Sequence, residues 1–146
     1  MVTEVNEVQC LDVRAGAGGL PVYSRTLPRE AGSAGVSRRV VTTVLTSWRL
    51  PPGFVDEARL VVDELVANAS EHAEGASIRV TITRTGRGVR LAVTDMDHAR
   101  PVLRTAGPGE EGGRGLFLVD EISDRWGVDP LPWGKRVWAE LALAAE

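Results

Sequence analysis

The sequence predicts an α/β protein, a two-layer sandwich in which a mixed β-sheet carries helices packed on one face. Apolar residues recur at helical spacing in three segments, and they alternate with polar residues in segments between them. The expected order is a strand, two helices, a hairpin, a helix and a final strand. Helices on one face of a sheet bury the apolar side of both layers, so this order favours the sandwich.

The first half of the chain supplies one strand and two helices. Residues 21–27 contain β-compatible side chains and end at Pro28, which fits a strand. Residues 33–48 carry a valine at every fourth position and end in tryptophan, which predicts an amphipathic helix. After a Pro-Pro-Gly break, residues 55–72 repeat the helical spacing and predict a second helix.

The second half begins with a hairpin. Residues 78–84 and 89–94 alternate with period two and are joined by a glycine-containing turn. Residues 95–112 are rich in proline and glycine, so we expect a loop there. A short third helix over residues 116–125 and a last strand over residues 136–143 complete the expected fold.

Length and composition indicate one ordinary globular domain. We expect residues 1–20 to form a flexible, glycine-rich leader and residues 21–146 to form a single domain. The net charge of −3 and the pI of about 5.5 give no basic footprint, so no direct nucleic-acid contact is expected. The chain shows no membrane-length apolar run, no signal-peptide pattern and a single cysteine, Cys10. A cytoplasmic protein without a membrane partner is the expectation.

Two polar residues in the second predicted helix are candidates for chemistry. Glu64 and Asn68 are four positions apart, so they lie on one face of the helix, about one turn apart. Asn68 is flanked by apolar residues, where an amide is costly unless something hydrogen-bonds to it. Its oxygen suits Mg²⁺, and Glu64 could accept a proton near a terminal phosphate. The alternative is an exposed Glu–Asn pair without a chemical role.

A glycine-rich stretch over residues 111–115 runs directly into the third predicted helix. Glycines let the backbone approach a ligand closely, and a helix N-terminus attracts phosphate. Arg114 adds a charge that can pair with phosphate oxygens. The alternative is a flexible linker followed by a helix start. The stretch is not a P-loop, because no Gly-Lys-Ser/Thr follows.

A carboxylate closes the second strand of the hairpin. Asp95 stands at the strand end, where it could accept a hydrogen bond from an adenine amino group. The alternative is that Asp95 belongs to a polar turn. Three neighbouring candidates for metal binding, His72, Asp97 and His98, match no zinc spacing.

Taken in order, these segments resemble the GHKL superfamily of ATP-binding domains. Residues 64–73, Glu-Leu-Val-Ala-Asn-Ala-Ser-Glu-His-Ala, resemble the N box of that superfamily. Residues 112–119, Gly-Gly-Arg-Gly-Leu-Phe-Leu-Val, resemble its second glycine box. Residues 126–128 together with 134–141 are similar to the ending of small actinobacterial members. The resemblance covers roughly residues 21 to 143 and implies the Bergerat, or histidine-kinase-like, fold.

The resemblance implies a role for each matching position, with ATP and Mg²⁺ as cofactors. Asn68 would bind Mg²⁺, and Glu64 would be the catalytic base. Asp95 would hold the adenine amine. The remaining contacts to the nucleotide, with the glycines facing the phosphates, would come from Gly113, Arg114, Gly115 and Leu116.

The branch that this sequence most resembles consists of anti-sigma-factor serine/threonine kinases. Its members phosphorylate an anti-sigma-factor antagonist and hold a sigma factor, often as homodimers. The first glycine box of the family usually reads Asp-x-Gly-x-Gly, whereas this chain has Asp95-Met96-Asp97-His98-Ala99. Two alternatives therefore stay open: a switch that binds nucleotide without catalysis, and a partner-binding module without nucleotide.

Overall fold

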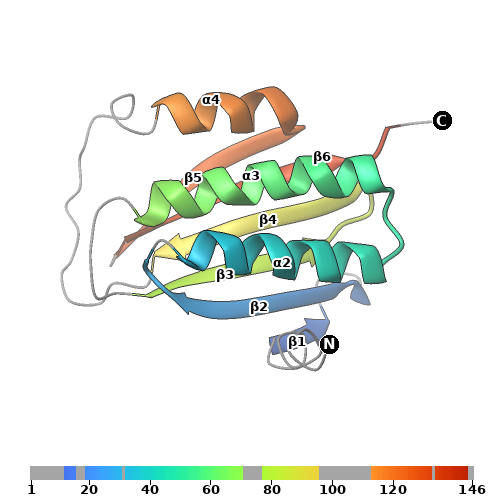
Figure 1. The fold of residues 1–146 in the computed structure, drawn as a ribbon, viewed down its shortest axis with the longest axis horizontal. Coiled ribbons are helices and arrows are strands. Elements are labelled where there is room, and N and C mark those ends of the chain that lie inside the picture. Colours follow the sequence, from blue (N-terminus) through green and yellow to red (C-terminus); the bar gives the residue numbers. More distant parts are fainter. Residues whose placement is uncertain are drawn as a thin grey trace.

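The computed structural model describes residues 12–15, 19–30, 32–70, 77–95, 113–132 and 134–144 (Figure 1). For residues 12–15, 70 and 113–115, it describes the backbone alone. In chain order, the elements are β1 (Asp12–Ala15), β2 (Pro21–Pro28), α2 (Gly32–Ser47), α3 (Pro52–Ser70), β3 (Ser77–Arg84), β4 (Gly88–Asp95), α4 (Gly113–Ile122), β5 (Arg125–Leu131) and β6 (Gly134–Ala142).

The predicted two-layer α/β sandwich is confirmed, and Figure 1 shows the helices lying together over one face of the sheet. The sheet has six strands in the order β1-β2-β3-β4-β6-β5. The expectation of a mixed sheet is wrong, because every pair of neighbouring strands described is antiparallel.

The strand β5 accounts for this correction. A single helix between β4 and a neighbouring strand would make that strand parallel to β4. Instead, the chain passes from α4 into β5 and then turns back, so β6 enters between β5 and β4 in the opposite direction. The chain leaves β2 at Pro28, and α2 and α3 form a helical hairpin that brings it back to the same end of the sheet, where β3 begins. The pair β2 and β3 is therefore antiparallel as well.

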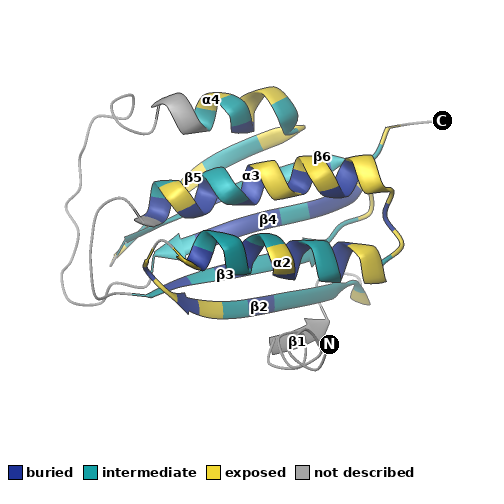
Figure 2. Ribbon diagram, in the orientation of Figure 1, coloured by how far each residue is buried: buried dark blue, intermediate teal, exposed yellow. Residues whose placement is uncertain are grey.

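The core fills the space between the helices and the sheet, as Figure 2 shows by the buried residues on their facing sides. The valine stripe predicted for the first helix is confirmed, with Val40 and Val44 almost fully buried. The largest fully buried side chains come from both layers and include Leu45, Leu65, Ile78, Ile82 and Leu91. This core fixes how α3 lies against β4, and these two elements carry most of the candidate site.

Several element boundaries differ from the sequence-based expectation. The second helix starts at Pro52 instead of residue 55, because proline suits the first helical position, where no N–H partner exists. The third helix ends at Ile122 instead of residue 125, and β5 begins at Arg125. Four residues of the expected leader form β1, which pairs with β2. Residues 96–112, expected as a loop, lie outside the described part.

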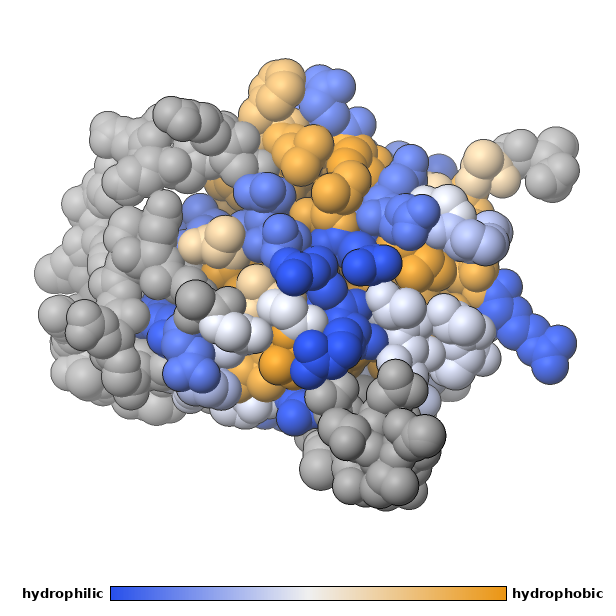
Figure 3. All heavy atoms as spheres, in the orientation of Figure 1, coloured by the Kyte–Doolittle hydropathy of each residue, from blue (hydrophilic) through white to orange (hydrophobic). Residues whose placement is uncertain are grey.

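The helix layer presents two kinds of surface in Figure 3. Hydrophilic side chains cover the seam between α2 and α3, where Arg38 pairs with Asp63 at 2.5 Å. Hydrophobic surface gathers toward α4, and the exposed large apolar side chains described are Leu60, Phe117 and Val128. Within the described ranges, no helix is long and apolar enough to cross a membrane.

Candidate nucleotide-binding site

The ends of two core elements and the start of a third meet at one end of the sandwich. The C-terminal ends of α3 and β4 and the N-terminal end of α4 all lie on the side where Figure 1 shows the β4 arrowhead. α3 packs against both β4 and α4. The predicted residues Glu64, Asn68 and Asp95 are therefore carried by elements that the core holds together.

Asn68 lies in the last turns of α3, and its side-chain oxygen lies inside the protein. The Oδ1 atom is buried, and it has no hydrogen-bond partner among the described residues. Buried polar atoms in folded proteins are nearly always satisfied, and an unsatisfied one calls for an explanation. An amide oxygen of this kind fits a hard cation such as Mg²⁺, which prefers oxygen ligands.

Glu64 lies one turn before Asn68 and is half-buried. Burial raises the pKa of its carboxyl group above the ordinary glutamate value, and the neighbouring charge of Asp63 raises it further. A carboxylate with a raised pKa is a better proton acceptor than an ordinary one, which is what a general base requires. The location and the pKa of Glu64 are thus compatible with the predicted role.

Asp95 closes β4 on the face of the sheet that the helices cover. It is paired with Ile78 of β3, a fully buried core residue, so both side chains point to the helix layer. The Asp95 side chain is 16% exposed and forms an ion pair with Arg29, with 2.8 Å between Nη2 and Oδ2. Asp95 is therefore a partly buried carboxylate held in a defined orientation.

The structure adds two residues that sequence analysis missed. Arg29 follows β2 and is the one charged residue that is buried among those the structure describes. Gly134 begins β6, where a Cβ atom would lie 2.9 Å from the Cβ of Asp95, so only glycine lets β6 start this close to the site. A glycine at a strand start was a weak signal of close backbone approach, whereas nothing in the sequence marked Arg29.

The glycine-rich stretch forms the start of α4. The helix begins at Gly113 instead of residue 116, so the backbone of Gly113, Arg114 and Gly115 makes its first turn. The free N–H groups of a first helical turn can bind phosphate. The side chain of Arg114 lies outside the described part, as do His72, Asp97 and His98. Leu116 is partly buried and packs against the hydrophobic core. No cluster of metal-binding side chains occurs among the described residues.

Comparison with known proteins identifies the class. Residues 27–141, most of the chain, match the family described as the histidine kinase-like ATPase domain. The chain belongs to this family and is a GHKL-type, ATP-binding domain. A 56-residue stretch is also 43% identical to an uncharacterized protein of Streptomyces coelicolor. That match covers 37% of this chain and 52% of the Streptomyces protein, so the chain spans about half the length of this relative.

Proposed function

We propose that this protein binds Mg²⁺-ATP and transfers the γ-phosphoryl group to a serine or threonine of a small regulatory protein. Its substrate is an anti-sigma-factor antagonist, and through this reaction and its own surface it restrains a sigma factor. The observation that carries the proposal is the buried Asn68 Oδ1, which has no hydrogen-bond partner among the described residues and lies one turn from a carboxylate of raised pKa.

In this proposal, Asn68 holds the cation through Oδ1. The donor fits, because an amide oxygen is a hard ligand and this one makes no hydrogen bond within the described part of the chain that ligation would break. Bound Mg²⁺ supplies positive charge that neutralises the phosphate oxygens. The backbone N–H groups at the start of α4 provide the second source of positive potential for the phosphates.

Glu64 acts as the base in the transfer. The hydroxyl oxygen of the substrate forms a bond to the γ-phosphorus, while the bond from that phosphorus to the β–γ bridging oxygen breaks. ADP leaves, and the hydroxyl proton passes to the Glu64 carboxylate. The raised pKa of Glu64 favours this proton transfer.

Asp95 binds the adenine by accepting a hydrogen bond from its amino group. The Asp95 carboxylate is partly buried and oriented by Arg29, so its geometry is fixed before a ligand arrives. We further propose that the protein works in the cytoplasm and assembles as a homodimer, as members of the anti-sigma-factor branch often do.

Titration calorimetry and a transfer assay together test this function. The wild-type protein is titrated with ATP and ADP, each with and without Mg²⁺. It is then incubated with γ-labelled ATP and candidate antagonists, and label on serine or threonine is located by mass spectrometry. Saturable Mg²⁺-dependent binding with transfer supports the kinase. Binding without transfer to any antagonist supports the non-catalytic switch, and no binding at millimolar ATP contradicts both.

A further inference from the structure

One guanidinium group connects the two elements that carry the proposed ligands. Arg29 Nε donates a hydrogen bond to the backbone carbonyl of Ala69 in α3, at 3.0 Å. Arg29 Nη2 forms the ion pair with Asp95 at the end of β4. Ala69 directly follows Asn68, so the same side chain fixes the proposed cation ligand and the proposed adenine ligand relative to each other.

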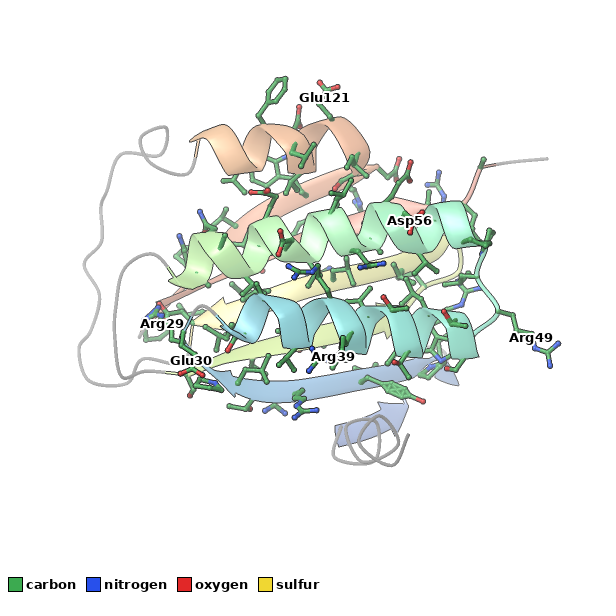
Figure 4. The ribbon with its side chains drawn as sticks, viewed as in Figure 1. Arg29, Glu30, Arg39, Arg49, Asp56 and Glu121 are labelled. Carbon is green, nitrogen blue, oxygen red and sulfur yellow. The ribbon has the colours of Figure 1, made fainter. Side chains whose placement is uncertain are left out.

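The backbone that carries Arg29 is itself held in place. Glu30 N donates to the carbonyl of Pro28, and Ser33 N donates to the carbonyl of Glu30, both at 3.0 Å. The Ser33 hydroxyl also donates to the carbonyl of Pro28. Figure 4 labels Arg29 at the end of the sandwich where α3 and β4 end. The turn between β2 and α2 therefore presents a guanidinium in a defined location.

Burying the Arg29 guanidinium is unfavourable if its only role is to stabilise the fold. The Arg29 side chain is 2% exposed, and its Nη1 is buried without a hydrogen-bond partner among the described residues. A buried ion pair often stabilises a fold no better than apolar residues of similar size, and an unsatisfied donor adds a further penalty. A role in ligand binding explains why a charged group with a spare donor lies there.

We propose that Arg29 is a positioning residue for nucleotide binding that also sets base preference; this inference rests on the proposed function. A carboxylate has about four acceptor sites on its two oxygens, so Asp95 can accept a hydrogen bond from a base amino group in addition to its contact with Arg29. Nη1 belongs to the same guanidinium group as the Nη2 atom that contacts Asp95, and it is a donor that suits a ring nitrogen. An acceptor next to a donor matches the amino and ring-nitrogen edge of adenine, whereas guanine presents the opposite pattern.

The test is calorimetric titration with Mg²⁺-ATP and Mg²⁺-GTP of the wild type and of the variants Arg29→Met, Arg29→Lys, Asp95→Asn and Arg29→Met/Asp95→Asn. Arg29→Met is expected to weaken ATP binding about tenfold or more, because a charge-assisted contact and an oriented acceptor are lost. It is also expected to reduce the preference for ATP over GTP. The double variant is expected to lose less than the product of the two single losses, since both act through Asp95.

The matched control is Arg125→Met, which removes an ion pair to Glu140 from a guanidinium that is 68% exposed. It is expected to leave both nucleotide affinities unchanged. If Arg29→Met does not fold, two other variants give the same comparison of ATP with GTP. One is the double variant, which leaves the net charge unchanged, and the other is Arg29→Lys, which keeps a positive charge but loses the planar array of donors of the guanidinium. An unchanged ATP/GTP ratio together with independent, multiplicative losses overturns the inference while leaving the proposed function intact. A wild type that binds neither nucleotide overturns both.

Discussion

Replacing Asn68 by alanine gives the sharpest test of the site, because ATP affinity should fall while the stability of the ligand-free protein does not. A buried polar atom without a partner costs about 1–3 kcal/mol. Asn68 Oδ1 is such an atom in the described structure. Alanine also favours a helix over asparagine by up to about 0.7 kcal/mol. Asn68→Ala is therefore expected to leave the free energy of unfolding of the ligand-free protein unchanged or to raise it by about 1–3 kcal/mol.

That increment corresponds to a rise in Tm of about 2–12 °C, at about 2–4 °C per kcal/mol for a chain of this size. Thermal denaturation without ligand, followed by circular dichroism, measures it. Mg²⁺-dependent ATP affinity, measured by calorimetry, is expected to fall at least about tenfold, because a ligand to a charged group is lost.

Ser37→Ala is the matched control for a satisfied buried polar group. The Ser37 hydroxyl is buried in α2 and donates to the carbonyl of Ser33 at 2.8 Å. Because this hydroxyl already has a hydrogen-bond partner, Ser37→Ala is not expected to raise the free energy of unfolding, and ATP affinity should stay the same. A fall in Tm of Asn68→Ala with unchanged ATP affinity would refute the reasoning, because Asn68 would then be a structural residue.

Two further substitutions test the remaining site. Glu64→Gln is expected to retain ATP binding and abolish phosphoryl transfer; label transfer at wild-type rate would exclude Glu64 as the base. Because the pKa of Glu64 is raised, its contribution to stability is fully present below the ordinary glutamate pKa and is lost as pH rises through the folded-state pKa. The Tm of Glu64→Gln relative to wild type should therefore increase as pH rises above the ordinary glutamate pKa. Gly134→Ala is expected to lower stability by about 1–3 kcal/mol and to weaken ATP binding, because the new Cβ would lie 2.9 Å from the Cβ of Asp95. Gly127→Ala, whose Cβ would lie 2.7 Å from Trp138 Cζ2, should lower stability similarly and spare ATP affinity; equal effects of the two on binding would show that Gly134 has no special relation to the site.

The sequence determined those features that depend on residues close together in the chain. Helical spacing located α2 and α3, and period-two alternation located β3 and β4, because the burial of one face imposes these periods. The same local geometry put Glu64 and Asn68 on one face of a helix. The glycine stretch likewise marked the start of α4, which begins at Gly113.

The strand β5 depended on a partner that local patterns do not reveal. Residues 125–131 include Gly127 and Pro130, which are unfavourable in an isolated strand. They form a strand because β6 offers a pairing edge, with Gly127 opposite Trp138. Once β5 is present, β6 must run antiparallel to β4, and this decided the sheet's topology.

Arg29 and the pKa of Glu64 were also decided by tertiary structure. The contact from Arg29 to Ala69 joins residues 40 positions apart, and its ion pair with Asp95 joins residues even further apart in the chain. The raised pKa of Glu64 arises from burial first and from neighbouring charge second. Periodicity indicates which residues share a face, but burial and long-range pairing exist only after the layers have packed. The sequence therefore indicated which residues are candidates for the site, and the tertiary structure determined what orients them.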